Sequence, residues 1–232
     1  MVIGGKHFGQ YTYEHWFDHE YGNADKTKPN FFLRLEEEKD HLSVENLTRE
    51  AFWNVYKPGC DEHLLIHKMR TSSCFIKELD YVAVLNDEIV GNIVYAKSKI
   101  ISENKDHDVL TFGPVSVLPV WQKKGIGKQL IEHTIKKSID MGFNAIIIYG
   151  NPKYYERFGF RNCSEYRITD MEGKYNHALL VLELYSGALE NISGKFFEGE
   201  IYKVDKNELE IFEKDFLFKE KLVLDTQIFK EE

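Results

Sequence analysis

The sequence predicts an α/β fold with seven strands and about four helices. Residues 81–96 are typical of a β-hairpin, since two apolar runs flank the turn Asn86-Asp87-Glu88. Residues 115–130 begin as an apolar strand, pass through a glycine-rich turn and continue with apolar side chains at helical spacing. Strands and helices therefore follow one another along the chain, as in folds that pack helices against a sheet.

The first third of the chain predicts one strand and two helices. Residues 1–30 show no clear period and are expected to form an N-terminal extension. Within it, His15, Asp18 and His19 have a spacing that metal ligands can share. A solvated helix explains the same spacing, so no metal is predicted. Residues 31–35 alternate as a strand, and 43–56 have helical spacing that Pro58-Gly59 ends. Asp61 is expected to cap the next helix.

The central part continues with the hairpin and a strand over 109–117. The helix that follows carries an apolar face, made of Ile126, Leu130, Ile131, Ile135 and Ile139. Gly142 is expected to end this helix, and residues 143–149 form a strand of buried type. Residues 166–169 and 177–185 are apolar enough for two last strands.

Residues 187–232 are expected to form a C-terminal extension of one strand and one helix. Residues 195–204 alternate as a strand, and Asp205 with Glu208 resembles a capping box. The helix places Leu209, Phe212 and Phe216 on one face, and it is too short to be stable alone. It should therefore dock on the main domain or on a second subunit, so a homodimer remains an alternative.

Composition limits the classes of function. Hydrophobic residues at 43% and charged residues at 29% describe a globular protein, and the chain has no run of 18 apolar residues that would predict a transmembrane helix. Its start lacks the apolar core of a secretory signal, and three well-separated cysteines suit reduced thiols, so a cytoplasmic location and no membrane partner are expected. A net charge of −8 argues against nucleic-acid binding and is compatible with an amine substrate.

The glycine-rich turn predicts an anion site. The first N–H groups of a helix have no partner within it, and the peptide dipoles add positive potential there. Gly125 and Gly127 let a phosphate approach the backbone closely, while Lys123, Lys124 and Lys128 add charge.

Two common phosphate motifs do not fit this turn. A dinucleotide fingerprint needs a third glycine where Leu130 stands, and a P-loop needs Gly at Gln122 and Ser or Thr at Gln129. What remains is Q-x-x-G-x-G, preceded by V-x-P at residues 117–119. It resembles the acyl-CoA pyrophosphate loop of the GNAT superfamily of N-acyltransferases; the alternative is a turn whose glycines serve packing alone.

A second signature lies about 30 residues downstream. The superfamily segment F-Y-x-x-x-G-F is matched by Tyr154, Tyr155, Gly159 and Phe160, with tyrosine for the first phenylalanine. The chain is most similar to a bacterial group of predicted N-acetyltransferases with loops G-P-V-S-V-L-P and G-x-P-x-Y-Y-x-R-F-G-F, matched at 113–119 and 150–160. The resemblance implies a GNAT domain over 31–186, with a central mixed, mostly antiparallel sheet, between extensions at 1–30 and 187–232.

The resemblance also implies acetyl-CoA as donor and assigns residues to its site. Backbone groups of β-strand residues would bind the pantetheine arm and polarise the thioester carbonyl, the loop would bind the pyrophosphate, and the complete expected set is Val115, Ser116, Val117, Gln122, Lys123, Lys124, Gly125, Ile126, Gly127, Lys128, Asn151, Tyr154 and Tyr155. Arg157 and Arg161 are expected at the surface or near the 3′-phosphate of the donor.

Two residues are expected to be catalytic. The resemblance makes Tyr155 the general acid for the leaving thiolate, the alternative being an aromatic core residue. Glu62 is the candidate base, within a segment that also offers Cys60, Asp61, His63 and His67, each of which has an ordinary reading as a solvated or capping residue. A base acting through ordered water is a further alternative.

The expected function is N-acetyltransfer from acetyl-CoA directly to a primary amine of a small molecule or peptide, without a metal. Two other classes stay open: a non-catalytic acyl-CoA-binding sensor or regulator, and a structural partner that uses its C-terminal extension for assembly. Release of thiol from acetyl-CoA in the presence of amines separates the enzyme from both.

Overall fold

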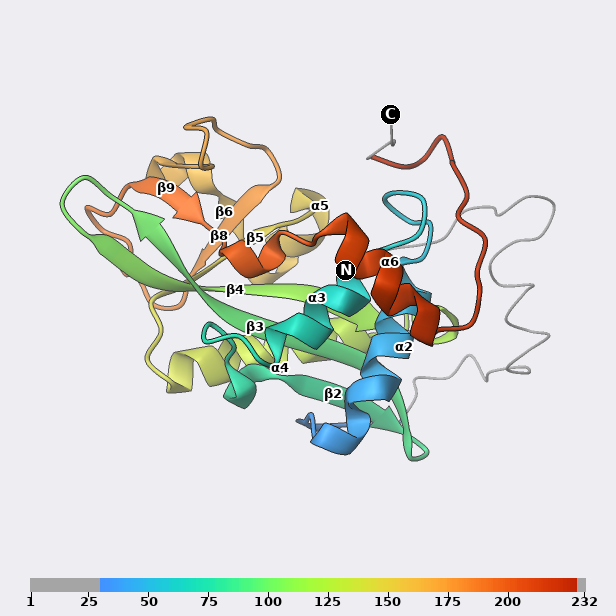
Figure 1. The fold of residues 1–232 in the computed structure, drawn as a ribbon. Coiled ribbons are helices and arrows are strands. Elements are labelled where there is room, and N and C mark those ends of the chain that lie inside the picture. Colours follow the sequence, from blue (N-terminus) through green and yellow to red (C-terminus); the bar gives the residue numbers. More distant parts are fainter. Residues whose placement is uncertain (1–29, 229–232) are drawn as a thin grey trace.

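The computed structural model describes residues 30–228, which form one sheet with helices on both faces (Figure 1). The expected N-terminal extension and the His15–His19 spacing lie outside these residues, apart from Asn30. The strand order is β1-β2-β3-β4-β5-β8-β6, and β9 pairs with both β3 and β7. All neighbours are antiparallel except β4–β5 and β7–β9, so the expected mixed, mostly antiparallel sheet is confirmed.

In the described part of the chain the sheet has nine strands, two more than the sequence predicted. They are β1 (Phe32–Leu35), β2 (Tyr81–Leu85), β3 (Glu88–Ile101), β4 (Asp106–Val117), β5 (Ala145–Tyr149), β6 (Arg161–Asn162), β7 (Ile168–Thr169), β8 (Leu179–Glu183) and β9 (Gly194–Phe197). The count of seven was wrong because β6 is too short to show a period, and because β9 of the extension joins the main sheet.

The α-helices of the described part are α2 (His41–Phe52), α3 (Glu62–Met69), α4 (Ile126–Asp140), α5 (Pro152–Tyr155) and α6 (Lys206–Phe212). In Figure 1, α2 and α3 lie in front of the sheet and α4 lies behind it. A Cβ on Gly91 of β3 would lie 2.9 Å from Ile126, so glycine lets α4 pack closely on the sheet. On the opposite face, the hydroxyls of Thr48 and Ser116 lie 3.0 Å apart and join α2 to β4.

Apolar packing fills both faces of the sheet. Behind it, Ile126, Leu130 and Ile131 of α4 are buried, whereas Ile139 is 48% exposed, because the end of the helix runs past the core. In front of it, α2 and α3 bury Val44, Ile66 and Met69 against β2 and β3. Within residues 30–228, no helix is both long and apolar enough to cross a membrane.

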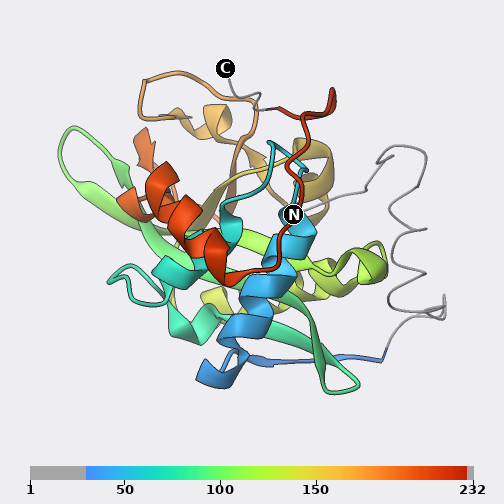
Figure 2. The same ribbon diagram turned by 45° about the vertical axis from the view of Figure 1, so that its right-hand side comes forward.

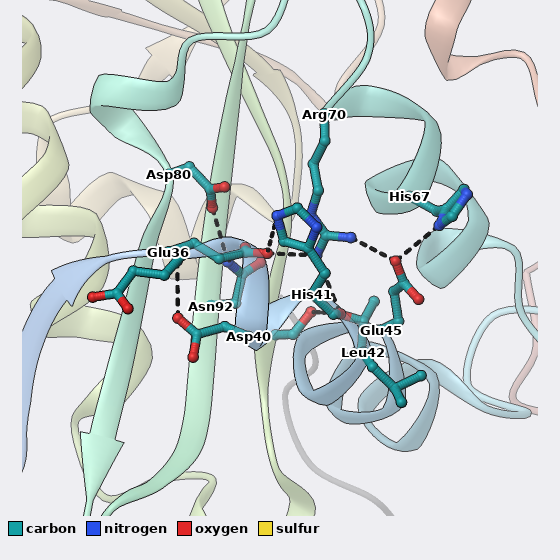
Figure 3. A network of polar contacts seen from close by, with 12 residues as sticks. Glu36, Asp40, His41, Leu42, Glu45, His67, Arg70, Asp80 and Asn92 are labelled. Atoms are coloured by element: carbon teal, nitrogen blue, oxygen red, sulfur yellow. Dashed lines mark hydrogen bonds and ion pairs between the residues drawn. The ribbon is translucent and has the colours of Figure 1, made fainter.

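A buried polar network joins α2 and β3 to the residues next to β1, α3 and β2 (Figure 3). Arg70 contacts Glu36 at 2.6 Å and Glu45 at 2.5 Å, and Asn92 donates to Asp80 at 3.1 Å. Burial, followed by the charge of Asp80, raises the pKa of Glu36. The carboxyl groups of Glu36 and Asp80 can share one proton, which removes the repulsion that two buried carboxylates would have.

The strands β4 and β5 separate soon after they meet. Their only paired position in the ladder is Leu110 with Ile146, although β4 continues to Val117. Beyond Leu110, one side of β4 therefore has no partner strand within residues 30–228. The N-terminus of α4 follows this open end, and α5 follows β5, so the separation gathers both sequence signatures at one edge of the sheet.

The C-terminal extension covers α2 and α3. After β9, Asp205 caps helix α6: its carboxylate accepts from Glu208 N–H at 2.9 Å, as the capping pattern predicted. Phe212 and Phe216 pack on His63, with ring centroids 5.4 and 5.2 Å away. The remaining residues, 217–228, pass along α2 toward the loop between α2 and α3 (Figure 2).

Candidate active site

A groove of about 430 Å³ lies at the N-terminus of α4. The N–H of Gln129 bonds to Gly125 C=O at 3.0 Å and is the first in this helix to have such a partner, so the N–H groups of Ile126, Gly127 and Lys128 are available to a ligand. Gly125 has φ +92°, a left-handed conformation that glycine adopts without strain. Twelve residues line the groove: Val117, Trp121, Gln122, Lys123, Gly125, Ile126, Gly127, Lys128, Asn151, Lys153, Tyr154 and Arg157.

The groove is cationic. Lys123, Lys128, Lys153 and Arg157 lie on its walls, while Lys124 of the same loop stacks on Trp121, with Nζ 4.3 Å from the ring centre. Open helix N–H groups and several cations together form a site for phosphate groups.

The two arginines of the second signature have different surroundings. Arg157 lines the groove, with its guanidinium 4.5 Å from the centre of the Tyr154 ring. Arg161 lies on β6 and pairs with Glu165 at 3.5 Å, away from the groove. The structure therefore favours Arg157, and not Arg161, as a neighbour of bound phosphate.

Only every second residue of β4 directs its backbone N–H and C=O groups to the open side of the strand. Leu118 N–H bonds to Val90 C=O at 3.0 Å, and because bonding alternates along an antiparallel pair, Ser116 also turns its backbone to β3. Val115 and Val117 then point their N–H and C=O groups to the open side, where Gln122 Nε2 donates to Val117 C=O at 3.1 Å. Of the three expected backbone sites, the geometry thus favours Val115 and Val117 and turns Ser116 away.

Helix α5 orients two adjacent tyrosines differently. Asn151 caps the helix, accepting from Lys153 N–H at 3.1 Å, and Tyr154 lines the groove. The Tyr155 ring lies directly over Gly150, where a Cβ would come within 2.4 Å of it. Glycine at position 150 therefore makes room for the Tyr155 ring.

Tyr155 lies where β4 and β5 separate. Its ring is 6.0 Å from that of Phe112, two positions beyond the last paired residue of β4, and the side chain is 4% exposed. Burial, followed by Tyr154 and Tyr56, raises the pKa of Tyr155 well above its usual range. At neutral pH the phenol keeps its proton and can act as a donor.

Glu62 occupies the first turn of α3. Burial, followed by the charge of Asp61, raises the pKa of Glu62 to about 7, although Lys57 opposes this. Burial raises the pKa of Tyr56, and the charge of Glu62 raises it further. Tyr56 in turn raises the pKa of Tyr155. Tyr56, in the loop between α2 and α3, therefore interacts electrostatically with both Glu62 and Tyr155.

The other candidate bases have structural partners. His63 is fully buried, with Nε2 2.6 Å from Glu213 Oε1 and Nδ1 3.5 Å from Cys60 Sγ. His67 pairs with Glu45 at 2.9 Å. Asp61 holds the N-cap position of α3 but forms no side-chain cap bond, contrary to the capping expected there; its carboxylate pairs with Lys57. Glu62 combines a carboxylate with a pKa raised to about 7 by burial.

Three residues of the site were not foreseen. Trp121 and Lys153 line the groove, and Tyr56 lies in the loop before Glu62. Trp121 directly precedes the Q-x-x-G-x-G motif, so its place in the sequence was an available signal. Tyr56 carries no such signal, because tertiary packing alone brings it near Tyr155. Residues 30–228 contain no cluster of three or more His, Cys, Asp or Glu side chains suited to a metal.

The chain is similar to known bacterial proteins, among them YjhQ and YhbS. YjhQ of Escherichia coli K12, an uncharacterized N-acetyltransferase, is 29% identical over 106 residues, which are 39% of this chain and 59% of YjhQ. YhbS of the same strain, also an uncharacterized N-acetyltransferase, is 22% identical over 163 residues, which are 70% of this chain and 92% of YhbS.

Crystal structures show the same fold. YhbS from Escherichia coli, in complex with CoA, has a TM-score of 0.67 at 20% identity and covers 78% of this chain and 95% of its own. A GNAT family acetyltransferase from Brucella melitensis, in complex with acetyl-CoA, has a TM-score of 0.60 at 22% identity, covering 75% and 99%.

The family comparison agrees with the two signatures. Residues 76–162 match the acetyltransferase (GNAT) domain family, a span that includes the groove loop, the open end of β4 and α5. Together with the fold, this match identifies residues 76–162 as an acyltransferase domain of the GNAT type, and the chain resembles the bacterial N-acetyltransferases.

Proposed function

We propose that this protein transfers the acetyl group of acetyl-CoA to a primary amine of a small molecule or peptide. The groove at α4 carries the proposal: open N–H groups, glycines and cations at one place suit the pyrophosphate of the donor. The similar chains crystallised with CoA or acetyl-CoA have the same fold, which supports the same donor here. Acetyl-CoA supplies the acetyl group as a thioester.

The open side of β4 would hold the reactive end of the donor. Val115 and Val117 have backbone groups without a strand partner on that side, and N–H groups directed at a carbonyl oxygen stabilise the negative charge that develops on it. The arm of the donor would then run from the groove toward Phe112 and Tyr155, along the gap between β4 and β5.

Two proton transfers complete the reaction. The amine nitrogen attacks the thioester carbon, and Glu62 accepts the proton that the nitrogen must lose, directly or through water. The C–S bond breaks, and Tyr155 donates its proton to the departing thiolate sulfur. The Tyr155 phenol is protonated at neutral pH, as an ordinary tyrosine is, and the pKa of about 7 makes Glu62 a base suited to neutral pH.

The alternative is a chain that binds acyl-CoA without catalysis. The 4% exposure of Tyr155 favours this reading, since the ring is packed as a core residue is. A panel of primary amines, assayed with a reagent that traps free thiol, separates the two. The enzyme releases CoA in proportion to one or more amines, whereas a sensor binds acetyl-CoA in calorimetry but releases no thiol with any amine.

A further inference from the structure

Asn54 joins the loop between α2 and α3 to the last described residues of the chain. Its Oδ1 accepts from Gly59 N–H at 2.7 Å and from Leu222 N–H at 3.0 Å, and its Nδ2 donates to Glu220 C=O at 2.9 Å. The side chain is 3% exposed, and the backbone has φ +59°. One buried amide thus fixes both ends of the turn 54–59 and attaches it to residues 217–228, which we name the C-terminal tail.

Further bonds follow the same contact. Gln227, 5% exposed, donates to Asn54 C=O at 3.2 Å, and Ile228 N–H donates to Tyr56 C=O at 3.1 Å. Trp53 Nε1–H donates to Glu220 C=O at 3.0 Å. A tail that bonds to three successive parts of one loop restricts the conformations of that loop.

This loop borders the proposed catalytic residues. Thr48 of α2 bonds to Ser116 beside the open end of β4. Trp53, where the loop begins, comes five positions later, which is about 7.5 Å from Thr48 along the helix axis. The loop contains Tyr56 and leads into Glu62, and Figures 1 and 2 both show it on the side of the sheet where α5 lies. It therefore lies beside α5, the helix that carries Tyr155.

We propose that the C-terminal tail, acting through Asn54, fixes the loop that forms the acceptor side of the active site in the conformation that accepts the amine. This inference rests on the proposed acetyltransfer, because the acceptor side is defined by Glu62 and Tyr155. Asn54 is a positioning residue: it holds Tyr56 and Glu62 in place. The aromatic ring of Tyr56 in the loop and the carboxylate of Glu62 at the start of α3 suit a primary amine that binds as its cation. The cation loses its first proton to solvent, and Glu62 accepts the second one, which the nitrogen releases on attack.

The test uses the full chain with Asn54→Gly. Glycine keeps the left-handed backbone of position 54 but removes all three side-chain bonds. We expect kcat/KM for the amine to fall roughly 10- to 100-fold, as for a small misplacement of reacting groups. The Kd of acetyl-CoA should not change, because the groove at α4 lies apart from the tail.

Two further variants serve as controls. Asn54→Asp keeps both acceptor bonds and loses only the donation to Glu220, so it should retain more activity toward the amine than Asn54→Gly. Phe218→Ser changes a tail residue that is 92% exposed and should behave as the wild type. If Asn54→Gly fails to fold, Gln227→Ala replaces it, since Gln227 bonds to Asn54 from the tail.

Hydrogen exchange at the Gly59 and Leu222 amides provides a readout independent of activity. Faster exchange, a lower amine kcat/KM and an unchanged Kd for acetyl-CoA support the inference. Unchanged amine kcat/KM, or a loss of acetyl-CoA affinity as large as the loss of kcat/KM, overturns it while leaving the acetyltransfer in place. No transfer by the wild type to any amine overturns the proposed function, and this inference with it.

Discussion

At the scale of single residues, Tyr154 and Tyr155 are adjacent in the chain but differ in surroundings. Tyr154 lines the α4 groove, and Tyr155 lies buried where β4 and β5 separate. Tyr155→Phe removes the proton donor but keeps the ring that packs on Gly150, so kcat should fall about 10²–10⁴-fold with little change in acetyl-CoA affinity. Steady-state kinetics and calorimetry measure the two quantities.

Tyr154→Phe is the control for that experiment, because its hydroxyl is not assigned to proton transfer and the superfamily pattern has phenylalanine there. Its kcat should remain within about twofold of the wild type, since no proton donor is lost. Equal kcat values for the two variants, or a Tyr155→Phe enzyme with nearly full kcat, would mean that solvent protonates the thiolate.

Glu62 gives the site a dependence on pH. Burial raises its pKa to about 7, and a base must be deprotonated, so kcat/KM for the amine should rise as the pH increases through about 7. Glu62→Gln should lower kcat/KM and remove this inflection, while the rise at higher pH from deprotonation of the amine itself remains. A wild-type inflection that persists in Glu62→Gln would assign the base to another group.

At the scale of elements, the N-terminus of α4 combines a dipole with open backbone groups. A Cβ on Gly127 would lie 3.6 Å from Val117 and 3.9 Å from the Tyr154 hydroxyl, which are ordinary contacts, so a side chain fits here in the free protein. An aspartate in the first turn also suits the helix dipole. The fold should therefore tolerate Gly127→Asp.

In the same variant, the new carboxylate occupies the phosphate site with negative charge. The Kd of acetyl-CoA should rise by at least about tenfold, or ~1.4 kcal/mol, while the melting temperature stays near that of the wild type. Calorimetry and thermal unfolding are the measurements. Unchanged affinity in the folded variant would place the pyrophosphate elsewhere.

At the scale of the whole molecule, the extension covers polar and aromatic groups of α2 and α3. Glu213 contacts Arg49 at 2.8 Å and His63 at 2.6 Å, and although burial opposes ionisation, these partners lower the pKa of Glu213 to about 2. Truncation after Val204 keeps β9 but removes this carboxylate and exposes Trp53 and His63, which are 7% and 0% exposed in the full chain.

The truncated protein should therefore be less stable. We expect the melting temperature to fall by at least about 5 °C, since one kcal/mol corresponds to roughly 2–4 °C in a chain of this size. Thermal unfolding of both proteins measures the change, and light scattering follows solubility. Equal melting temperatures and equal solubility would show that α6 and the tail contribute no packing energy to the domain.

The sequence by itself determined the elements whose cause is local. Helical spacing and glycine ends predicted α4 and the turn before it, alternation predicted the hairpin of β2 and β3, and Asp205 predicted the start of α6. The Q-x-x-G-x-G loop could be predicted as a phosphate site because the residues that form it are consecutive in the sequence. For the same reason the donor site is better defined by sequence than the acceptor site.

Tertiary structure alone decided what depends on distant residues. The separation of β4 from β5 fixes which backbone groups of β4 are open and buries Tyr155, and neither fact is visible in a local pattern. The sequence offered His63 and His67 as candidate bases, but the structure pairs each with a carboxylate. His63 pairs with Glu213, 150 positions away, and His67 pairs with Glu45, 22 positions away. Asn54 acquired its role only when the end of the chain folded back onto it, because hydrogen bonds between remote segments leave no period in a sequence.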